Sequence, residues 1–193
     1  MSDLPDRDDA LALLHEWVES EGLRKHMLGV EAVMRHYARK RGADEDLWGL
    51  AGLLHDLDWE AHPDRHPLEA VEALRERGYP EEVLHAILAH RSDFTGVEPE
   101  TEMDKHLIAS DELSGLVVAA CLVRPNGVDD IRPKSVRKKL KDASFAAGVS
   151  REEVEWGIEL IGIDRNEHIQ NVIEGLRSVG AELEIRGEDL ARS

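Results

Sequence analysis

The dipeptide His55-Asp56 places two side chains that bind metals at the end of an apolar run, Leu53-Leu54-His55-Asp56-Leu57. A buried carboxylate is costly unless it is paired or bound to a cation, so the sequence must supply partners. An alternative is a capped helix end in which His55 bonds a backbone carbonyl. Eight of the ten histidines fall between residues 26 and 106: His26, His36, His55, His62, His66, His85, His90 and His106.

Other residues could converge on this pair. Asp111 interrupts the apolar stripe of a predicted helix, and an acidic residue on such a stripe is rare without a partner. His26 neighbours Met27 on an inner helix face, and His90 follows Ile87 by three residues on the buried side of its helix. A single histidine at a helix flank is more often a packed residue than a ligand. The coincidence of several favours a metal site.

The chemistry of this residue mixture is that of a divalent transition metal. Imidazole and carboxylate ligands suit Fe, Mn, Co, Ni or Zn. The two oxygens of Asp56 could bridge a pair of ions, so the site could hold one ion or two. Two ions about 3.5 to 4 Å apart can activate a water molecule and bind a phosphoryl oxygen.

The elements that must position these residues are helices, because apolar residues recur at spacings of three and four and no alternating strand pattern is present. Gly42 is expected to end one helix and Asp44 to begin the next. Residues 92–100 are expected to form a loop, and residues 181–193 a frayed tail. Further helices are expected at residues 67–78, from Pro80 onward, and at 101–123, 151–162 and 166–180.

Composition limits the possible functions. The chain of 193 residues carries a net charge of -17, which repels nucleic acid and anionic membrane and favours a small substrate. We find no membrane-spanning run and no signal-peptide pattern, so a cytoplasmic location is expected. The single cysteine, Cys121, lies in an apolar stretch and is expected to be a buried thiol.

The segment 124–141 departs from this acidic balance, because it holds seven of the twenty-four basic residues. Helical spacing places Lys134, Arg137, Lys138 and Lys141 on one face. This face could bind the anionic substrate, with Lys134 and Lys138 as substrate-binding residues and Arg91 reaching the same anion from beside His90. Alternatively, it is a solvated helix surface.

The order of His26, His55-Asp56, His66, His90 and Asp111 resembles the HD superfamily of metal-dependent phosphohydrolases. The resemblance covers about residues 20 to 115, and Ala109-Ser110-Asp111-Glu112-Leu113 is similar to the final aspartate motif of that family. It implies an all-α HD-domain helical bundle with a C-terminal helical extension. Residues 1–123 would form the metal-binding core, and residues 124–193 would pack on the same domain.

The resemblance also implies roles for individual residues. His26, His55, Asp56 and Asp111 would form a first metal site, and Asp56 would bridge to a second ion held by His66 and His90. His62 competes with His66 for that position, and we prefer His66. The expected catalytic residues are Asp56, which is also a ligand, Asp58 and His62.

The function expected from these residues is hydrolysis of a small phosphate ester, of the nucleotide or sugar phosphate class, by a metal-activated hydroxide. A diiron oxygenase of the same superfamily and a non-catalytic metal- or nucleotide-binding module are the alternatives. The expected partner is a small phosphorylated molecule, with no nucleic acid and no membrane, and a homodimer is possible.

Overall fold

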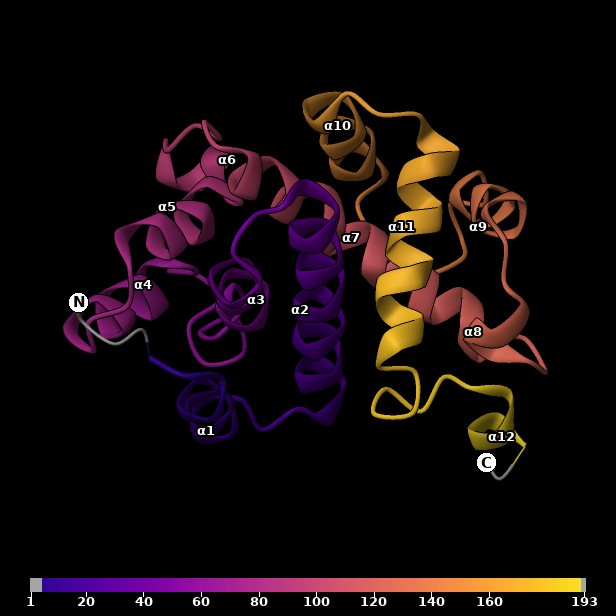
Figure 1. Cartoon of the computed structure of the whole chain (residues 1–193), viewed down its shortest axis with the longest axis horizontal. Coiled ribbons are helices and arrows are strands. Elements are labelled where there is room, and N and C mark those ends of the chain that lie inside the picture. Colours follow the sequence, from indigo (N-terminus) through magenta and orange to yellow (C-terminus); the bar gives the residue numbers. More distant parts are fainter. Residues whose placement is uncertain (1–4, 192–193) are drawn as a thin grey trace.

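The computed structural model describes residues 5–191 and confirms the all-α fold (Figure 1). Within these residues every named element is a helix: α1 (Arg7–Trp17), α2 (Glu21–Arg41), α3 (Glu45–Leu54), α4 (Leu68–Glu76), α5 (Glu81–Ala89), α6 (Ser92–Thr95), α7 (Glu102–Leu122), α8 (Gly127–Asp130), α9 (Pro133–Leu140), α10 (Arg151–Ile161), α11 (Arg165–Ser178) and α12 (Gly187–Leu190).

The long helix α2 is the centre of the fold. It packs against α3, α7 and α11, and Figure 1 shows α3 and α11 on opposite sides of it. The helices after residue 123 share this core, since Ile169, Val172 and Leu176 of α11 are completely buried in the same hydrophobic cluster as Met27 and Val30 of α2. The N-terminal core and the closing helices are therefore packed together.

Local sequence signals set the ends of these helices. Ser20 and Asp44 accept hydrogen bonds from backbone N–H groups in the first turns of α2 and α3. Gly42 ends α2 with a φ of 65°, in the left-handed region that glycine adopts without strain. At the start of α7, Thr101 and Asp104 form a reciprocal capping box.

Two glycines allow α3 and α10 to pack closely against α2 and α7, which carry His26 and Asp111. A Cβ on Gly52 of α3 would lie 2.9 Å from the Glu31 backbone of α2, and a Cβ on Gly157 of α10 would lie 2.5 Å from the Ala109 Cα of α7. Real Cβ atoms do not make contacts this short. Glycine at position 52 therefore brings the end of α3 against α2, three residues before His55.

The prediction of a frayed tail at residues 181–193 is wrong for the described part, which ends at residue 191. Leu183 and Ile185 are buried, and the Val128 N–H donates to the Ile185 carbonyl at 2.8 Å. The apolar pair anchors this segment on the core, and α12 follows it. Residues 192 and 193 lie outside the described residues. The predicted loop 92–100 also begins with the short helix α6.

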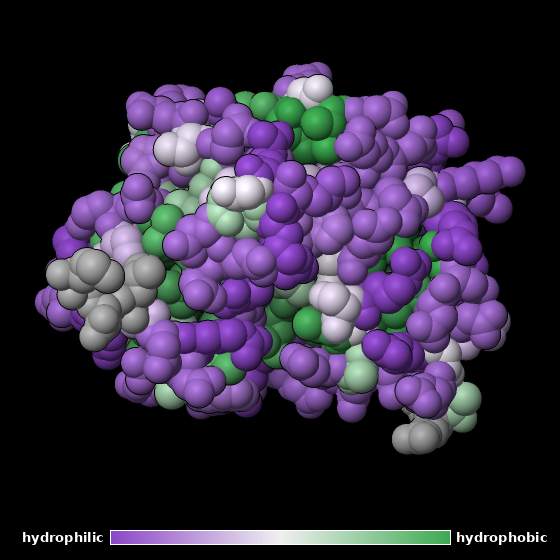
Figure 2. Space-filling model, in the orientation of Figure 1, coloured by the Kyte–Doolittle hydropathy of each residue, from purple (hydrophilic) through white to green (hydrophobic). Residues whose placement is uncertain are grey.

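The surface reflects the composition. Figure 2 shows one face covered mainly by hydrophilic side chains, with smaller apolar areas between them. Between residues 5 and 191, no helix has both the length and the apolar character needed to cross a membrane. Cys121 is buried, as expected, and burial raises the pKa of its thiol to about 12.

Candidate metal centre

The fold gathers the six residues expected as ligands into one cluster. Four of the six lie at or just outside helix ends. The six are His26 in α2, His55 at the C-cap of α3, Asp56 in the turn that follows, His66 just before α4, His90 at the C-cap of α5, and Asp111 within α7.

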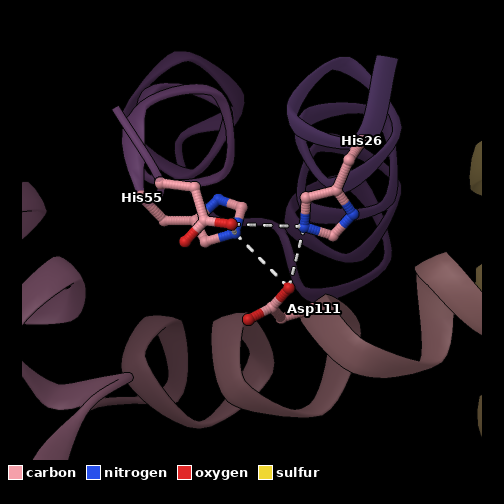
Figure 3. A group of neighbouring side chains, drawn as sticks. His26, His55 and Asp111 are labelled. Carbon is pink, nitrogen blue, oxygen red and sulfur yellow. Dashed lines mark ion pairs between the residues drawn. The ribbon is translucent and has the colours of Figure 1, made fainter. Parts of the chain in front are cut away.

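The first group consists of His26, His55, Asp56 and Asp111, whose potential ligand atoms all lie within 4.8 Å of one another. His26 Nε2 is 2.9 Å from Asp111 Oδ1, and His55 Nε2 is 3.4 Å from the same oxygen. Figure 3 shows His26, His55 and Asp111 pointing toward one another from three helical segments. Asp56 Oδ2 completes the group, 3.4 Å from His55 Nε2 and 3.7 Å from His26 Nε2.

The second group consists of Asp56, His66 and His90. Asp56 Oδ1 lies 3.3 Å from His66 Nε2 and 3.7 Å from His90 Nε2. The two oxygens of Asp56 therefore face different histidine sets, as a carboxylate that bridges two cations must.

Hydrogen bonds on the far side of each ring fix which nitrogen carries the proton. The Nδ1 atoms of His55 and His90 donate to the backbone carbonyls of Gly52 and Ile87, at 2.9 and 2.5 Å. Carbonyl oxygens only accept, so these Nδ1 atoms are protonated and the Nε2 atoms point into the cluster. His66 is oriented in the same way by a carboxylate. This arrangement is typical of metal-ligating histidines.

Some nitrogen atoms inside the cluster lack a favourable partner, and a cation could supply one. His66 Nε2 lies 3.1 Å from His90 Nε2, and two neutral rings in these tautomers would face each other with lone pairs only. Among the described residues, the buried His55 Nε2 finds no hydrogen-bond partner. A divalent transition metal meets both needs, so the residues present fit such an ion.

The electrostatics point the same way. Burial opposes a charge on His55, but the carboxylates of Asp56 and Asp111 outweigh it and raise the pKa of His55 well above its ordinary value. Burial likewise disfavours the Asp56 carboxylate, yet the neighbouring histidines hold the pKa of Asp56 well below its ordinary value. The cluster therefore favours positive charge at its centre.

The competition between His62 and His66 has a clear geometric outcome. His66 is buried in the cluster, whereas His62 is exposed and contributes only backbone hydrogen bonds. The structure therefore does not bring His62, expected as catalytic, to the centre. Asp58, also expected as catalytic, is completely buried behind His66, with its two oxygens bonded to His66 Nδ1 and the Ala70 N–H. That geometry suits a positioning residue.

A cavity of about 400 Å³ opens over the cluster, and Arg91 lines it as expected. Sequence reasoning missed Trp59, Glu112 and Glu153, which also line it. Burial and the neighbouring Asp111 raise the pKa of Glu112 to about 7, against a hydrogen bond from the Ser150 N–H. Glu112 directly follows Asp111, a signal that could have been used. Nothing in the sequence links Glu153 to the cluster.

The two lysines expected to bind substrate lie elsewhere. Lys134 and Lys138 line a second cavity that shares no lining residue with the one over the cluster. The expectation that they form a wall of the metal centre is therefore not supported by their position. Sequence spacing predicts which residues share a helix face, but it does not predict which cavity that face lines.

An apolar cavity of about 380 Å³ adjoins the centre. It shares His26 and Gly115 with the cavity over the cluster, and its other walls include Val118, Leu176 and Leu183. A Cβ on Gly115 would approach no atom closer than 3.9 Å, the distance to Val149 Cγ2. Because residue 115 is a glycine and has no side chain, space remains beside His26.

Comparison with known proteins agrees with this geometry. Residues 23–116 match the HD domain family, and this stretch holds all six clustered residues. The chain is also similar to Ribonuclease Y of Oleidesulfovibrio alaskensis, with 29% identity over 139 residues, which are 68% of this chain. The match spans 25% of the length of that protein. For residues 23–116, the match to the HD domain confirms the resemblance indicated by the order of the histidines and aspartates.

Proposed function

We propose that this protein is a metal-dependent phosphohydrolase that cleaves a small phosphate ester. The observation that carries the proposal is the placement of Asp56, whose two oxygens face two separate histidine groups under one cavity. Divalent metal ions held there would supply Lewis acid chemistry, lowering the pKa of water and neutralising charge on phosphoryl oxygens.

The residues of the chain supply position and charge. His26, His55, Asp56 and Asp111 would hold one ion, and Asp56, His66 and His90 a second. Asp58 holds the His66 ring in the orientation that directs Nε2 toward Asp56. Trp59 lines one side of the cavity, with its ring centroid 5.1 Å from that of His66.

The cavity favours a small substrate with one phosphate group. Arg91 provides a guanidinium at the rim, although Asp93 already pairs with it at 3.2 Å. Glu112 and Glu153 add carboxyl groups to the wall, which oppose the approach of an extended polyanion and suit hydroxyl or amino groups of a substrate. These features support a nucleotide or sugar phosphate more than an RNA, the substrate named in Ribonuclease Y.

The test is metal analysis of the purified chain, followed by hydrolysis assays on nucleoside monophosphates, sugar phosphates, phosphodiesters and a short RNA. Asp111→Asn keeps the size of the side chain but removes its charge, so we expect it to lose bound metal and activity together. His36→Asn is the matched control, because His36 lies outside the cluster and bonds Asn171.

Three outcomes would contradict the proposal. Full activity in Asp111→Asn would remove the cluster from the reaction. Oxygen uptake with iron bound, without phosphate release, would favour the oxygenase alternative. Nucleotide binding at a metal-loaded centre without turnover would favour a binding module.

A further inference from the structure

The cavity against α9 is a separate feature of the molecule. It has a volume of about 580 Å³ and is lined by Lys134, Arg137, Lys138, Leu140, Lys141, Glu155 and Arg165. Five cationic side chains against one carboxylate give this lining a net charge of four positive, on a chain whose net charge is -17. Such a concentration of one sign in a concave surface raises the local concentration of anions.

The positive charge is not neutralised within the chain. Arg165 pairs with Glu155, so these two cancel. Lys139, outside the cavity, lies over the Phe145 ring at 3.9 Å from its centroid. Among residues 5–191, no ion pair or hydrogen bond joins a side chain to any of the other four cations, Lys134, Arg137, Lys138 and Lys141. The chain has 41 acidic residues, so partners are not scarce.

The packing of α9 holds these four side chains together. Val136 and Leu140 are buried against the core and fix the orientation of the helix. The four cations stand at spacings of three and four on the exposed side, where like charges repel one another. A bound anion would relieve that repulsion. A helix face that is only solvated gains no stability from four like charges. Glutamates placed between the cations would remove the repulsion among them.

We propose that this cavity binds the phosphate chain of a small polyphosphate ligand, of the triphosphate class. The four unpaired cations match a ligand with three to four negative charges. Within residues 5–191, no aromatic side chain lines the cavity, so recognition rests on phosphate rather than on a stacked base. The net charge of -17 on the whole chain opposes a long nucleic acid, which would extend beyond this cavity.

The test is isothermal titration of the full chain with inorganic triphosphate, ATP and a single-stranded RNA of about twenty nucleotides. We expect the double variant Lys134→Ala/Lys138→Ala to bind triphosphate about tenfold or more weakly, since each lysine lost removes a charge-assisted contact. Arg39→Ala/Arg75→Ala is the matched control. It removes the same charge from exposed ion pairs with Glu45 and Glu81, and triphosphate affinity should stay within about twofold.

A second variant separates this site from the metal centre. Asp111→Asn should keep triphosphate binding, because the two cavities share no lining residue. Loss of binding in Asp111→Asn, with retention in the lysine variant, would assign the anion to the metal centre and overturn the proposal. RNA binding stronger than triphosphate binding, and lost in the lysine variant, would replace the small ligand by a nucleic acid. Equal affinities for ATP and triphosphate would support recognition of the phosphate chain, whereas binding of ATP alone would overturn it.

Discussion

His66 donates its Nδ1 proton to Asp58, a carboxylate with no exposed surface, across 2.7 Å. The other oxygen of Asp58 accepts from the Ala70 N–H in the first turns of α4, at 2.9 Å. Both acceptor oxygens are therefore in use. Together the two hydrogen bonds hold the imidazole so that its Nε2 faces Asp56. The orientation of this candidate ligand therefore depends on the position of the start of α4.

We predict that Asp58→Asn weakens metal binding at the second group. An amide has one acceptor oxygen, so its NH₂ group must face either His66 Nδ1–H or the Ala70 N–H. Loss of such an orienting partner typically weakens metal affinity by about 10- to 100-fold. Metal titration should show one class of ion weakened and the class at His26, His55 and Asp111 retained.

The control for this variant is Asp104→Asn. Asp104 is also completely buried beside a histidine, 3.0 Å from His85 Nδ1, but it lies outside the cluster. Its loss weakens the capping box of α7 and should lower stability without changing metal affinity. Equal metal affinities in Asp58→Asn and the wild type would show that Asp58 does not orient a ligand.

Much of the fold and the identity of the clustered residues could be predicted from the sequence. Helical spacing and cap residues are local signals, so Gly42, Asp44 and Thr101 gave correct helix ends. Asp111 was recognisable because it interrupts an apolar stripe. The placement of Lys134 depends on how α9 packs on α7 and α11, and spacing within one helix carries no information about that packing.

The prediction of a frayed tail at residues 181–193 was wrong for a related reason. Leu183 and Ile185 are surrounded by charged residues, and apolar residues are too few in this stretch to show a periodicity. Their burial depends on contacts with Val128 and α2, which are distant in the sequence. Asp58 was noticed, but its position behind His66 requires knowledge of the turn that brings Ala70 beside it.

Metal removal should destabilise the chain. The ligands come from α2, α3, α5, α7 and the segment before α4, so a bound ion links elements that unfolding would separate. An ion at 100 times its dissociation constant adds about 2.7 kcal/mol. For a chain of this size the Tm should fall by about 5 to 10 °C after chelation. Calorimetry with and without chelator measures this, and Asp111→Asn should show a smaller difference. An unchanged Tm in metal-free protein would contradict the prediction.

Acid should destabilise the protein through His168. Burial lowers the pKa of His168 from 6.5 to about 4, against a hydrogen bond to the Ala109 carbonyl. The unfolded chain therefore binds more protons than the folded one between these values, and the free energy of unfolding falls as the pH falls through this window. The contribution approaches 3 kcal/mol, on the order expected for such a shift. His168→Gln should reduce the slope of unfolding free energy against pH between 6.5 and 4. Parallel curves for the two proteins would contradict this assignment.

Gly115 offers a test of whether substrate uses the space beside His26. It lines both the cavity over the cluster and the apolar cavity, and a Cβ there meets only ordinary contact with Val149. Alanine is favoured over glycine within a helix by about 1 kcal/mol, so Gly115→Ala should fold at least as stably and keep its metal. Gly115→Leu fills the shared space, and with a substrate identified we expect KM to rise about tenfold or more, with metal content unchanged. If Gly115→Leu keeps the KM of the wild type, the substrate does not occupy this side of the centre, and the wall formed by Trp59 and Arg91 must contact it instead.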